Sequence, residues 1–399
     1  MNVLVVSQYY YPEPFRINEI CEELVRRRNK VTVITANPNY PDGEIYAGYR
    51  NENREEIING VSVYRCKCRP RYSGIVNLTR NYIDFVLKVN KQIEKIKGEF
   101  DCIYMYQLSP ITSCLPAIKL KKKKNIPIFL YCLDVWPESL RGSILGNPIG
   151  MKIIGVISRY IYKSADKLAV TSPAFEKYIS KLCNIDINSI QYIPQHSTDI
   201  KQMMNNNISK RDKVVNFVFM GNIGEVQNLE CLLKAVALID DRRKFKIHIV
   251  GSGSYYKKCV RLASDLAITD TVIFYGRYPK TELSRFYEMA DVCYASLKDE
   301  GIVGSTIPGK IQEYMSAGKP ILACMNGDTA DLIKEAECGL CVPANDENEL
   351  SVAIIKMVSS EMDLKTIGNN SRKYFTKHFT LSAHADRLEV ELDKLIKNN

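Results

Sequence analysis

The sequence predicts an α/β protein with two domains, each built on a mainly parallel sheet that is covered by helices. Three observations support this. The 399 residues exceed the usual size of one core. Strand-like apolar runs alternate with helical patterns along the whole chain. A polar segment, residues 196–213 with Asn205–Asn207 inside it, separates two such series, so we expect a linker there and a domain boundary near residue 200.

The first series begins with a strand, a loop, a helix and a second strand. Apolar runs predict strands over residues 2–7, 31–36, 61–66, 101–106, 126–134 and 165–170. Helical spacing predicts helices over residues 19–28 and 77–97. The loop Gln8–Asn18 follows the first strand, which is where an open α/β sheet places its ligands.

The second series has glycines at the ends of three strands. Strands are predicted over residues 214–220, 246–250, 272–275, 292–295 and 320–324, and helices over 229–238, 256–266, 281–290, 347–358 and 381–396. The first three strands end in Gly221-Asn-Ile-Gly224, Gly251-Ser-Gly253 and Gly276-Arg277. In a parallel sheet these turns share one edge, where glycine lets the backbone approach a ligand closely.

The stretch STIPGKIQEYMSAGKPIL, residues 305–322, predicts a loop, a helix and a strand. Pro308 suits the first helical turn, Thr306 before it is a candidate cap, and Gly318 suits the helix end.

The start of this helix is a candidate phosphate site, because bare N–H groups and the positive end of the dipole meet there. Lys310 adds a charge, and Glu313 on the same face can accept two hydrogen bonds from a sugar diol. The alternative is that the proline and glycine are ordinary helix boundaries and that Glu313 is a solvated surface residue.

Composition indicates a globular protein whose cysteines are reduced. Hydrophobic residues make up 46% and charged residues 25%. We expect no transmembrane helix and no signal peptide. The 13 cysteines are scattered, so we expect free thiols and a cytoplasmic location. Cys338 and Cys341 form a C-x-x-C without a second pair, so we expect packing and no metal site.

Charge is concentrated in the first half of the chain. Residues 1–200 contain 28 Lys and Arg against 19 Asp and Glu, which accounts for +9 of the net +10. A basic surface attracts anionic lipid, nucleic acid or phosphorylated acceptors, although it also serves solubility alone. No nucleic-acid-binding module is recognisable, so we expect no nucleic-acid partner.

Taken together, seven motifs resemble the family 4 glycosyltransferases of the GT-B type. They are SQYYYPE, TANPNYPDG, LDVWPES, GNIGEVQNLE, VGSGS, FYGR and PGKIQEYMSAGKPILA, and they occur in order along the chain. The resemblance is strongest to the bacterial branch with the fucosamine and colanic-acid transferases of surface polysaccharide.

The resemblance implies two Rossmann-like domains that face each other across a cleft. Residues 1–200 would bind the acceptor, and residues 201–379 would bind a nucleotide sugar. A last helix, about residues 380–399, would cross back to the first domain.

Carried over by position, the resemblance places Glu313 on the ribose. Ser305 stands where the family has a first glutamate, and Asn222 and Gln227 stand where it has Arg and Lys. Lys310 would then supply the charge for the diphosphate. The expected donor-nucleotide site comprises Gly221, Asn222, Gly224, Gln227, Gly251, Gly253, Arg277, Ile307, Pro308, Gly309, Lys310 and Glu313.

The expected acceptor side comprises Tyr11, Glu13, Arg16, Asn18 and Asp134. Residues 1–195 contain no histidine, so Asp134 is the carboxylate that we place in the chemistry, together with Lys310 and Glu313. The alternative for Asp134 is a helix cap for the segment after Pro137.

The implied reaction is retaining transfer of a hexosyl or N-acetylhexosaminyl group from a UDP-sugar, with no metal or other cofactor. The implied acceptor is a polyprenyl-diphosphate-linked saccharide of O-antigen, capsule or exopolysaccharide synthesis. The protein would touch the inner face of an anionic membrane, with Arg69, Arg71, Arg80 and Lys121–Lys124 as candidate lipid contacts. Two alternatives are a sugar-nucleotide epimerase on the same fold and a non-catalytic nucleotide-sugar-binding subunit.

Overall fold

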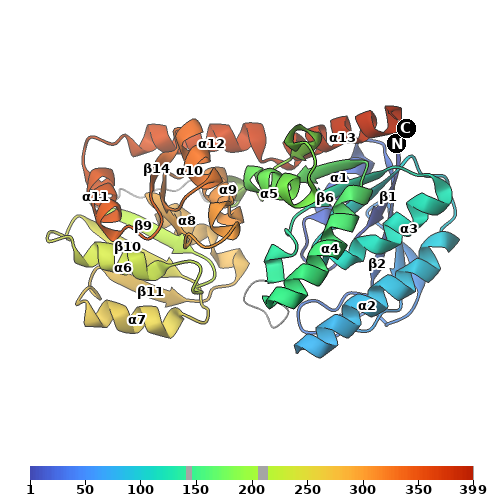
Figure 1. Ribbon diagram of the computed structural model, residues 1–399. Coiled ribbons are helices and arrows are strands. Elements are labelled where there is room, and N and C mark those ends of the chain that lie inside the picture. The colour runs from blue at the N-terminus through green and yellow to red at the C-terminus, as the bar shows by residue number, and fades with distance from the viewer. Residues whose placement is uncertain (141–145, 205–213, 399) are drawn as a thin grey trace. The chain divides into compact units, whose positions relative to one another are not determined.

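The computed structural model describes residues 1–140, 146–204 and 214–398 (Figure 1). The chain divides into two compact units. The first unit combines Met1–Gln195 with Leu381–Asn399, and the second is His196–Thr380. The expected Asn205–Asn207 segment lies outside the described residues.

The first unit contains an eight-stranded sheet with the order β3-β4-β2-β1-β5-β6-β7-β8. Its strands are β1 (Asn2–Val6), β2 (Lys30–Ala36), β3 (Arg54–Ile58), β4 (Val61–Cys66), β5 (Cys102–Gln107), β6 (Ile128–Cys132), β7 (Lys167–Val170) and β8 (Ile190–Tyr192). All neighbours are parallel except β3 and β4.

The antiparallel edge strand β3 was absent from the predicted strands. It forms a hairpin with β4 through Asn59-Gly60, whose φ angles of 49° and 82° suit a tight two-residue turn. Its sequence REEII carries three charges, so an apolar-run criterion does not detect it. Charged side chains are typical of an edge strand, where they discourage further pairing.

The first unit also contains helices α1 (Ile17–Arg26), α2 (Ile75–Gln92), α3 (Leu115–Lys124), α4 (Pro148–Ser164), α5 (Pro173–Cys183) and α13 (Leu381–Lys397). Helix α13 packs Leu388, Leu392 and Leu395 into the same core as β1, β2 and β5. The expectation that the last helix returns to the first domain is therefore confirmed.

Helix α4 was not predicted because its hydrophobic pattern is reversed. It buries the small residues Gly155 and Ser158, together with Ile161 and Tyr162. Several of its larger apolar residues, including Ile149, are exposed. A search for an apolar stripe with polar residues opposite does not identify such a helix.

The second unit contains a six-stranded, wholly parallel sheet with the order β11-β10-β9-β12-β13-β14. Its strands are β9 (Val215–Met220), β10 (Phe245–Val250), β11 (Val272–Gly276), β12 (Val292–Ser296), β13 (Ile321–Cys324) and β14 (Gly339–Val342). Its helices are α6 (Leu229–Ala237), α7 (Tyr256–Asp265), α8 (Ser284–Met289), α9 (Gly309–Ser316), α10 (Asp328–Glu335), α11 (Glu347–Val358) and α12 (Leu364–His378).

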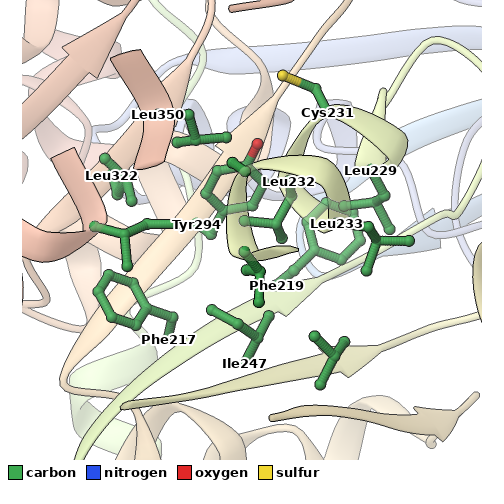
Figure 2. Close-up of a cluster of buried hydrophobic side chains, with 14 of the residues drawn as sticks. Phe217, Phe219, Leu229, Cys231, Leu232, Leu233, Ile247, Tyr294, Leu322 and Leu350 are labelled. Carbon is green, nitrogen blue, oxygen red and sulfur yellow. The ribbon is translucent and has the colours of Figure 1, made fainter. Parts of the chain in front are cut away.

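Two buried clusters, one of them drawn in Figure 2, sandwich this second sheet. In Figure 2, Phe219 of β9 and Tyr294 of β12 lie against Leu232 and Leu233 of α6. The second cluster contains the alternate side chains of the same strands, such as Val218 and Cys293. Burial on both faces explains why these strands read as continuous apolar runs.

The expected linker is wrong in its first part. His196 and Ser197 are buried, and both carboxylate oxygens of Asp199 accept hydrogen bonds from Arg372, at 2.5 and 2.7 Å. The backbone N–H of Ile200 donates to Ser316 Oγ of α9. Residues 196–204 are thus an integral segment of the second unit.

All 13 cysteines are free thiols, as predicted, and all except Cys341 are buried. In the described ranges, no helix has both the length and the apolar character needed to cross a bilayer.

Candidate functional site

Three loops meet at the carboxyl edge of the second sheet, where β9, β10 and β11 end. Backbone hydrogen bonds join them directly. Gly221 N–H donates to Val250 O at 3.0 Å, Gly251 N–H to Gly276 O at 2.8 Å, and Ile223 N–H to Ser252 O at 2.9 Å. The prediction that these turns share one edge is confirmed.

Two of the glycines bring the loops close to each other. A Cβ on Gly251, whose φ is +145°, would lie 1.8 Å from Gly221 O. A Cβ on Gly253 would lie 2.4 Å from Ile223 O. At both positions the Cβ would clash with the neighbouring loop. Glycine is therefore required here so that the two loops can pack against each other.

Asn222 and Gln227 shape the loop after β9. Gln227 Oε1 accepts hydrogen bonds from Gly224 N–H at 3.0 Å and from Asn222 Nδ2 at 3.3 Å. These two amide side chains, which stand where the resemblance places Arg and Lys, therefore hold the loop and supply no positive charge.

A hollow of about 420 Å³ opens between these loops. Five predicted donor residues line it: Gly221, Asn222, Gly251, Gly253 and Arg277. Val250, Ser252, Tyr278 and Leu283 complete the lining. Tyr278 and Leu283 were missed because they follow the strand end and carry no motif of their own. Its volume is within the range of small-ligand sites.

Helix α9 begins beside these loops. It starts at Gly309, so Pro308 is the residue before the helix, with φ −67° and ψ 144°. Pro308 has no side-chain acceptor, so it does not cap this end itself. The Thr306 carbonyl accepts from Thr329 Oγ1. The first N–H groups of a helix have no partner within the helix and are candidates to bind a ligand.

Lys310 is the outstanding charge in this region. Its Nζ has no exposed surface and no hydrogen-bond partner. It lies 4.0 Å from the centre of the Phe219 ring and would lie 3.4 Å from a Cβ on Gly221. Burial lowers the pKa of Lys310 to about 8, and the negative charge of Glu313 partly opposes this shift. A buried ammonium without an acceptor is suited to an incoming anion.

Glu313 lies one turn further along α9. Its Oε2 accepts a hydrogen bond from Tyr287 Oη at 3.2 Å. The next residue, Tyr314, accepts from Met220 N–H at 3.1 Å and so ties α9 to the end of β9. The helix thus holds Lys310 and Glu313 at a defined position relative to the glycine loops.

Ser305 ends a short 3₁₀ turn (Val303–Ser305) and lies directly against Gly327. A Cβ on Gly327 would lie 2.7 Å from Ser305 Cβ. Ile307, also predicted for the donor site, packs against the core of the second unit.

In the first unit, Glu13 is a structural residue. It is 1% exposed, and its carboxylate accepts hydrogen bonds from the backbone N–H groups of Tyr10, Asn39 and Tyr40. Burial raises the pKa of Glu13 to about 7 in spite of these bonds. The buried carboxylate thus joins the loops after β1 and β2, and its expected contact with the acceptor stays a prediction.

The other predicted acceptor-side residues are held in different ways. Asn18 donates from Nδ2 to the Glu13 carbonyl at 2.7 Å, and Arg16 donates to Gln195 Oε1 at 3.0 Å. Tyr11 is exposed.

Asp134 follows β6 and is fixed by the loop after β5. Its Oδ2 accepts from Ser109 N–H at 3.1 Å and from Ser109 Oγ at 2.8 Å. Trp136 Nε1 donates to the same Ser109 Oγ. The Asp134 carboxylate thus binds Ser109. The structure does not show the alternative, in which Asp134 caps the helical segment after Pro137.

No group of three or more His, Cys, Asp and Glu side chains suited to a metal ion occurs in the part of the chain that the structure describes.

A model of the family described as glycosyl transferases group 1 matches residues 200–374. This range includes the three glycine loops, the 420 Å³ hollow and helix α9.

Three curated relatives carry glycosyltransferase names. The probable glycosyltransferase WbjE of Pseudomonas aeruginosa is 26% identical over 62% of this chain and 63% of its own length. An uncharacterized glycosyltransferase of Methanocaldococcus jannaschii is 25% identical over 95% of this chain and 94% of that protein. The O-antigen chain mannosyltransferase C of Escherichia coli is 22% identical over 95% of both chains.

Solved structures share the fold over the whole chain. Sucrose-phosphate synthase from Thermosynechococcus elongatus superposes with a TM-score of 0.75 at 18% identity and covers 100% of both chains. The Anabaena protein HepE, solved with UDP and glucose, gives a TM-score of 0.67 at 14% identity over 99% of this chain and 100% of that one. The fold is therefore of the GT-B type, as predicted.

Proposed function

We propose that the chain is a retaining glycosyltransferase, which moves a sugar from UDP to an acceptor hydroxyl. The match of residues 200–374 to the group 1 glycosyl transferases supports this proposal. HepE, which shares the fold, was solved with UDP and glucose.

The observation that carries the proposal is the buried Lys310 ammonium. It lacks a hydrogen-bond acceptor and lies beside Gly221, in the first turn of α9. A diphosphate bound here receives hydrogen bonds from Nζ and from the first N–H groups of the helix. The negative charge that develops on the leaving diphosphate during transfer is stabilised by the same groups. We propose that these protein groups balance the negative charge of the diphosphate and that no metal takes part.

The nucleoside is placed by the residues on either side of Lys310. The hollow lined by Gly251, Gly253 and Arg277 would take the base. Glu313, held by Tyr287, would accept hydrogen bonds from the two ribose hydroxyls. Ser305 would face the donor sugar without a charge, which distinguishes this chain from family members with glutamate there.

We place the acceptor in the first unit, with Asp134 as the carboxylate nearest the reacting hydroxyl. The hydrogen bonds from Ser109 hold this side chain in one orientation at the end of β6. Attack comes from the face that the diphosphate leaves, and the departing phosphate oxygen accepts the hydroxyl proton.

The acceptor that we propose is a lipid-linked saccharide of surface-polysaccharide synthesis. The names of two relatives support surface-polysaccharide synthesis: the O-antigen chain mannosyltransferase C and the putative colanic acid biosynthesis glycosyl transferase WcaI, both of Escherichia coli. Such an acceptor lies at the inner face of the cell membrane, and the chain would work there.

Thermal unfolding with UDP, GDP, ADP, CMP and several UDP-sugars tests the donor site. A ligand that binds the folded state raises the melting temperature. We expect UDP to stabilise the wild type and Lys310→Met to lose most of this effect, while Lys356→Met in the last turn of helix α11 retains it. A shift with GDP alone would contradict the UDP assignment, and equal shifts for both variants would contradict the role of Lys310.

Turnover separates the remaining alternatives. Release of UDP from a UDP-sugar that depends on a lipid-linked acceptor supports transfer. Conversion of the sugar without an acceptor would indicate an epimerase. Binding without either reaction would indicate a non-catalytic subunit.

A further inference from the structure

Helices α2, α3 and α4 of the first unit lie side by side (Figure 1). On α4, four large apolar side chains are exposed: Ile149 (74%), Ile153 (56%), Val156 (54%) and Tyr160 (45%). They are spaced by four, three and four residues, so they form one face of the helix, which we call the α4 stripe. Exposed apolar patches of this kind mark contact surfaces.

Helix α2 carries a second stripe of the same kind. Val76, Ile83 and Leu87 are all more than half exposed. Their spacing places them on one face, with the exposed Arg80 between them. We call these three residues the α2 stripe.

Basic side chains surround both stripes. Helix α2 has Arg80, Lys88 and Lys91, helix α3 has Lys119 and Lys121–Lys124, and helix α4 has Lys152, Arg159 and Lys163. The one acidic residue within the bounds of these helices is Asp84. Glu94 and Asp166 lie beside them and form ion pairs with Lys119, Lys121 and Lys123. The basic side chains still outnumber these three acidic ones, so the apolar side chains lie in a surface with net positive charge.

Three of the lipid contacts expected from the sequence have partners within the protein. Lys121 is paired with Asp166 at 2.6 Å, and Lys123 is paired with Glu94 at 2.7 Å. Arg71 lies over the Tyr40 ring and donates to Pro41 O. The basic residues of α4 were missed because the helix itself was not predicted.

We propose that the α4 and α2 stripes insert into the headgroup region of an anionic bilayer while the surrounding lysines and arginines bind lipid phosphates. Two features of the face select this partner. Its charge is complementary to that of anionic lipid, and its apolar residues stand among long cationic side chains, as on helices that lie in a membrane interface. A transmembrane segment is not required for such binding.

This proposal extends the proposed function, since a lipid-linked acceptor would be reached from the same surface. It is tested without donor or acceptor, so the two can fail separately. Full-length protein is mixed with vesicles of phosphatidylcholine alone or with 30% phosphatidylglycerol, and the bound fraction is measured by flotation. We expect binding to the anionic vesicles, and weaker binding as salt rises.

Two variants separate the apolar and the cationic contributions. Ile149→Ser/Ile153→Ser/Val156→Ser should weaken binding about tenfold or more, because the inserted apolar area is lost. Lys152→Gln/Arg159→Gln/Lys163→Gln should weaken binding and reduce its salt dependence. The matched control is Val352→Ser/Ile355→Ser on α11 of the second unit, whose side chains are 60% and 54% exposed. Circular dichroism and melting temperature confirm that each variant folds.

Insertion has its own readout. A tryptophan at position 153, introduced as Ile153→Trp, should be quenched by lipids brominated on their acyl chains, whereas Val352→Trp should not. Vesicle binding that is equal in the α4 variants and the α11 control would overturn the proposal. The proposal would also be overturned if the wild type bound no vesicles but self-associated, and if the Ile149/Ile153/Val156 variant abolished this self-association. The face would then be a contact between copies of the chain.

Discussion

At the scale of the residue, Lys310 is a buried positive charge without a hydrogen-bond acceptor. Its ammonium is buried over Phe219 and beside Gly221, where burial holds its pKa at about 8, below the ordinary 10.5. The cost of keeping this charge without an acceptor is recovered when an anion binds. The affinity of the site should therefore depend on the protonation of this one group.

Nucleotide binding should weaken as pH rises above about 8. In the free protein Lys310 loses its proton in that range, whereas a bound diphosphate favours the charged form and raises the pKa. UDP affinity should therefore fall by up to about tenfold per pH unit above pH 8. Isothermal titration between pH 7 and 10 measures this.

The same linkage predicts the stability of the free protein. Between about pH 8 and 10.5 the unfolded chain keeps the Lys310 proton, whereas the folded protein loses it. The free energy of unfolding should therefore increase with pH over this range. Lys310→Met should remove both pH dependences. A variant that keeps the wild-type decline in UDP affinity would show that another group titrates.

Glu313 should confer preference for ribose. Its carboxylate, oriented by Tyr287, can accept from both ribose hydroxyls. The wild type should bind UDP about tenfold or more tightly than 2′-deoxy-UDP, and Glu313→Ala should bind both almost equally. Calorimetry with both ligands and both proteins gives the coupling free energy between the Glu313 side chain and the ribose 2′-hydroxyl. An unchanged preference in Glu313→Ala would place the ribose elsewhere.

At the scale of the element, the edge of the second sheet depends on the backbone contact between two loops. The loop after β10 passes so close to the loop after β9 that position 251 has no room for a side chain. The hollow that we propose for the nucleotide is therefore formed by direct backbone pairing of neighbouring loops. Its stability and its binding are expected to change together.

Gly251→Ala should destabilise the second unit by about 3 kcal/mol or more, because the new Cβ clashes with Gly221 O and the φ of +145° is unfavourable for alanine. Urea unfolding followed by fluorescence or circular dichroism measures the loss. The control is Gly301→Ala, which has a positive φ of 59° but no atom within 4 Å of the new Cβ. It should cost only about 1 kcal/mol. Equal losses in the two variants would mean that the backbone angle alone matters.

At the scale of the whole molecule, the chain returns to its first unit after completing the second. Helix α13 inserts Leu388, Leu392 and Leu395 into the core of the first unit. Arg27 of α1 pairs with Asp386 and Glu389 of α13, at 2.6 and 2.9 Å, and His384 Nδ1 lies 2.9 Å from Pro194 O. The ends of the chain are thus stabilised together.

Leu392→Ala should destabilise the first unit by about 3 kcal/mol through the cavity it leaves. Hydrogen exchange followed by mass spectrometry should then show faster exchange in β1, β5 and α1, with β9 and β10 unaffected. The exposed Val390 on the same helix provides the control, since Val390→Ala removes no buried contact. Faster exchange throughout both units would contradict the assignment of α13 to the first unit.

The fold class, both sheets and most of their strands could be predicted from the sequence, whereas β3, β8 and β14 were missing from the predicted ranges. Continuous apolar runs of strand length reflect burial on both faces, and this local pattern needs no knowledge of the partners. The position of the glycine turns at one edge also followed, because strands of a parallel sheet all end on the same side. Lys310 and Glu313 were found because they follow a helix start in a recognisable motif.

The contacts of Lys310, Glu313 and the glycine turns could be known only from the folded structure. Only packing shows that Gly251 is required by a neighbouring loop, that Glu13 is enclosed by backbone amides, and that Lys310 has no acceptor. Helix α4 was missed for the same reason, since its buried face is made of small residues and its isoleucines are exposed. A periodicity in sequence identifies an apolar face, but which face is covered is set by contacts between segments that are distant in the chain.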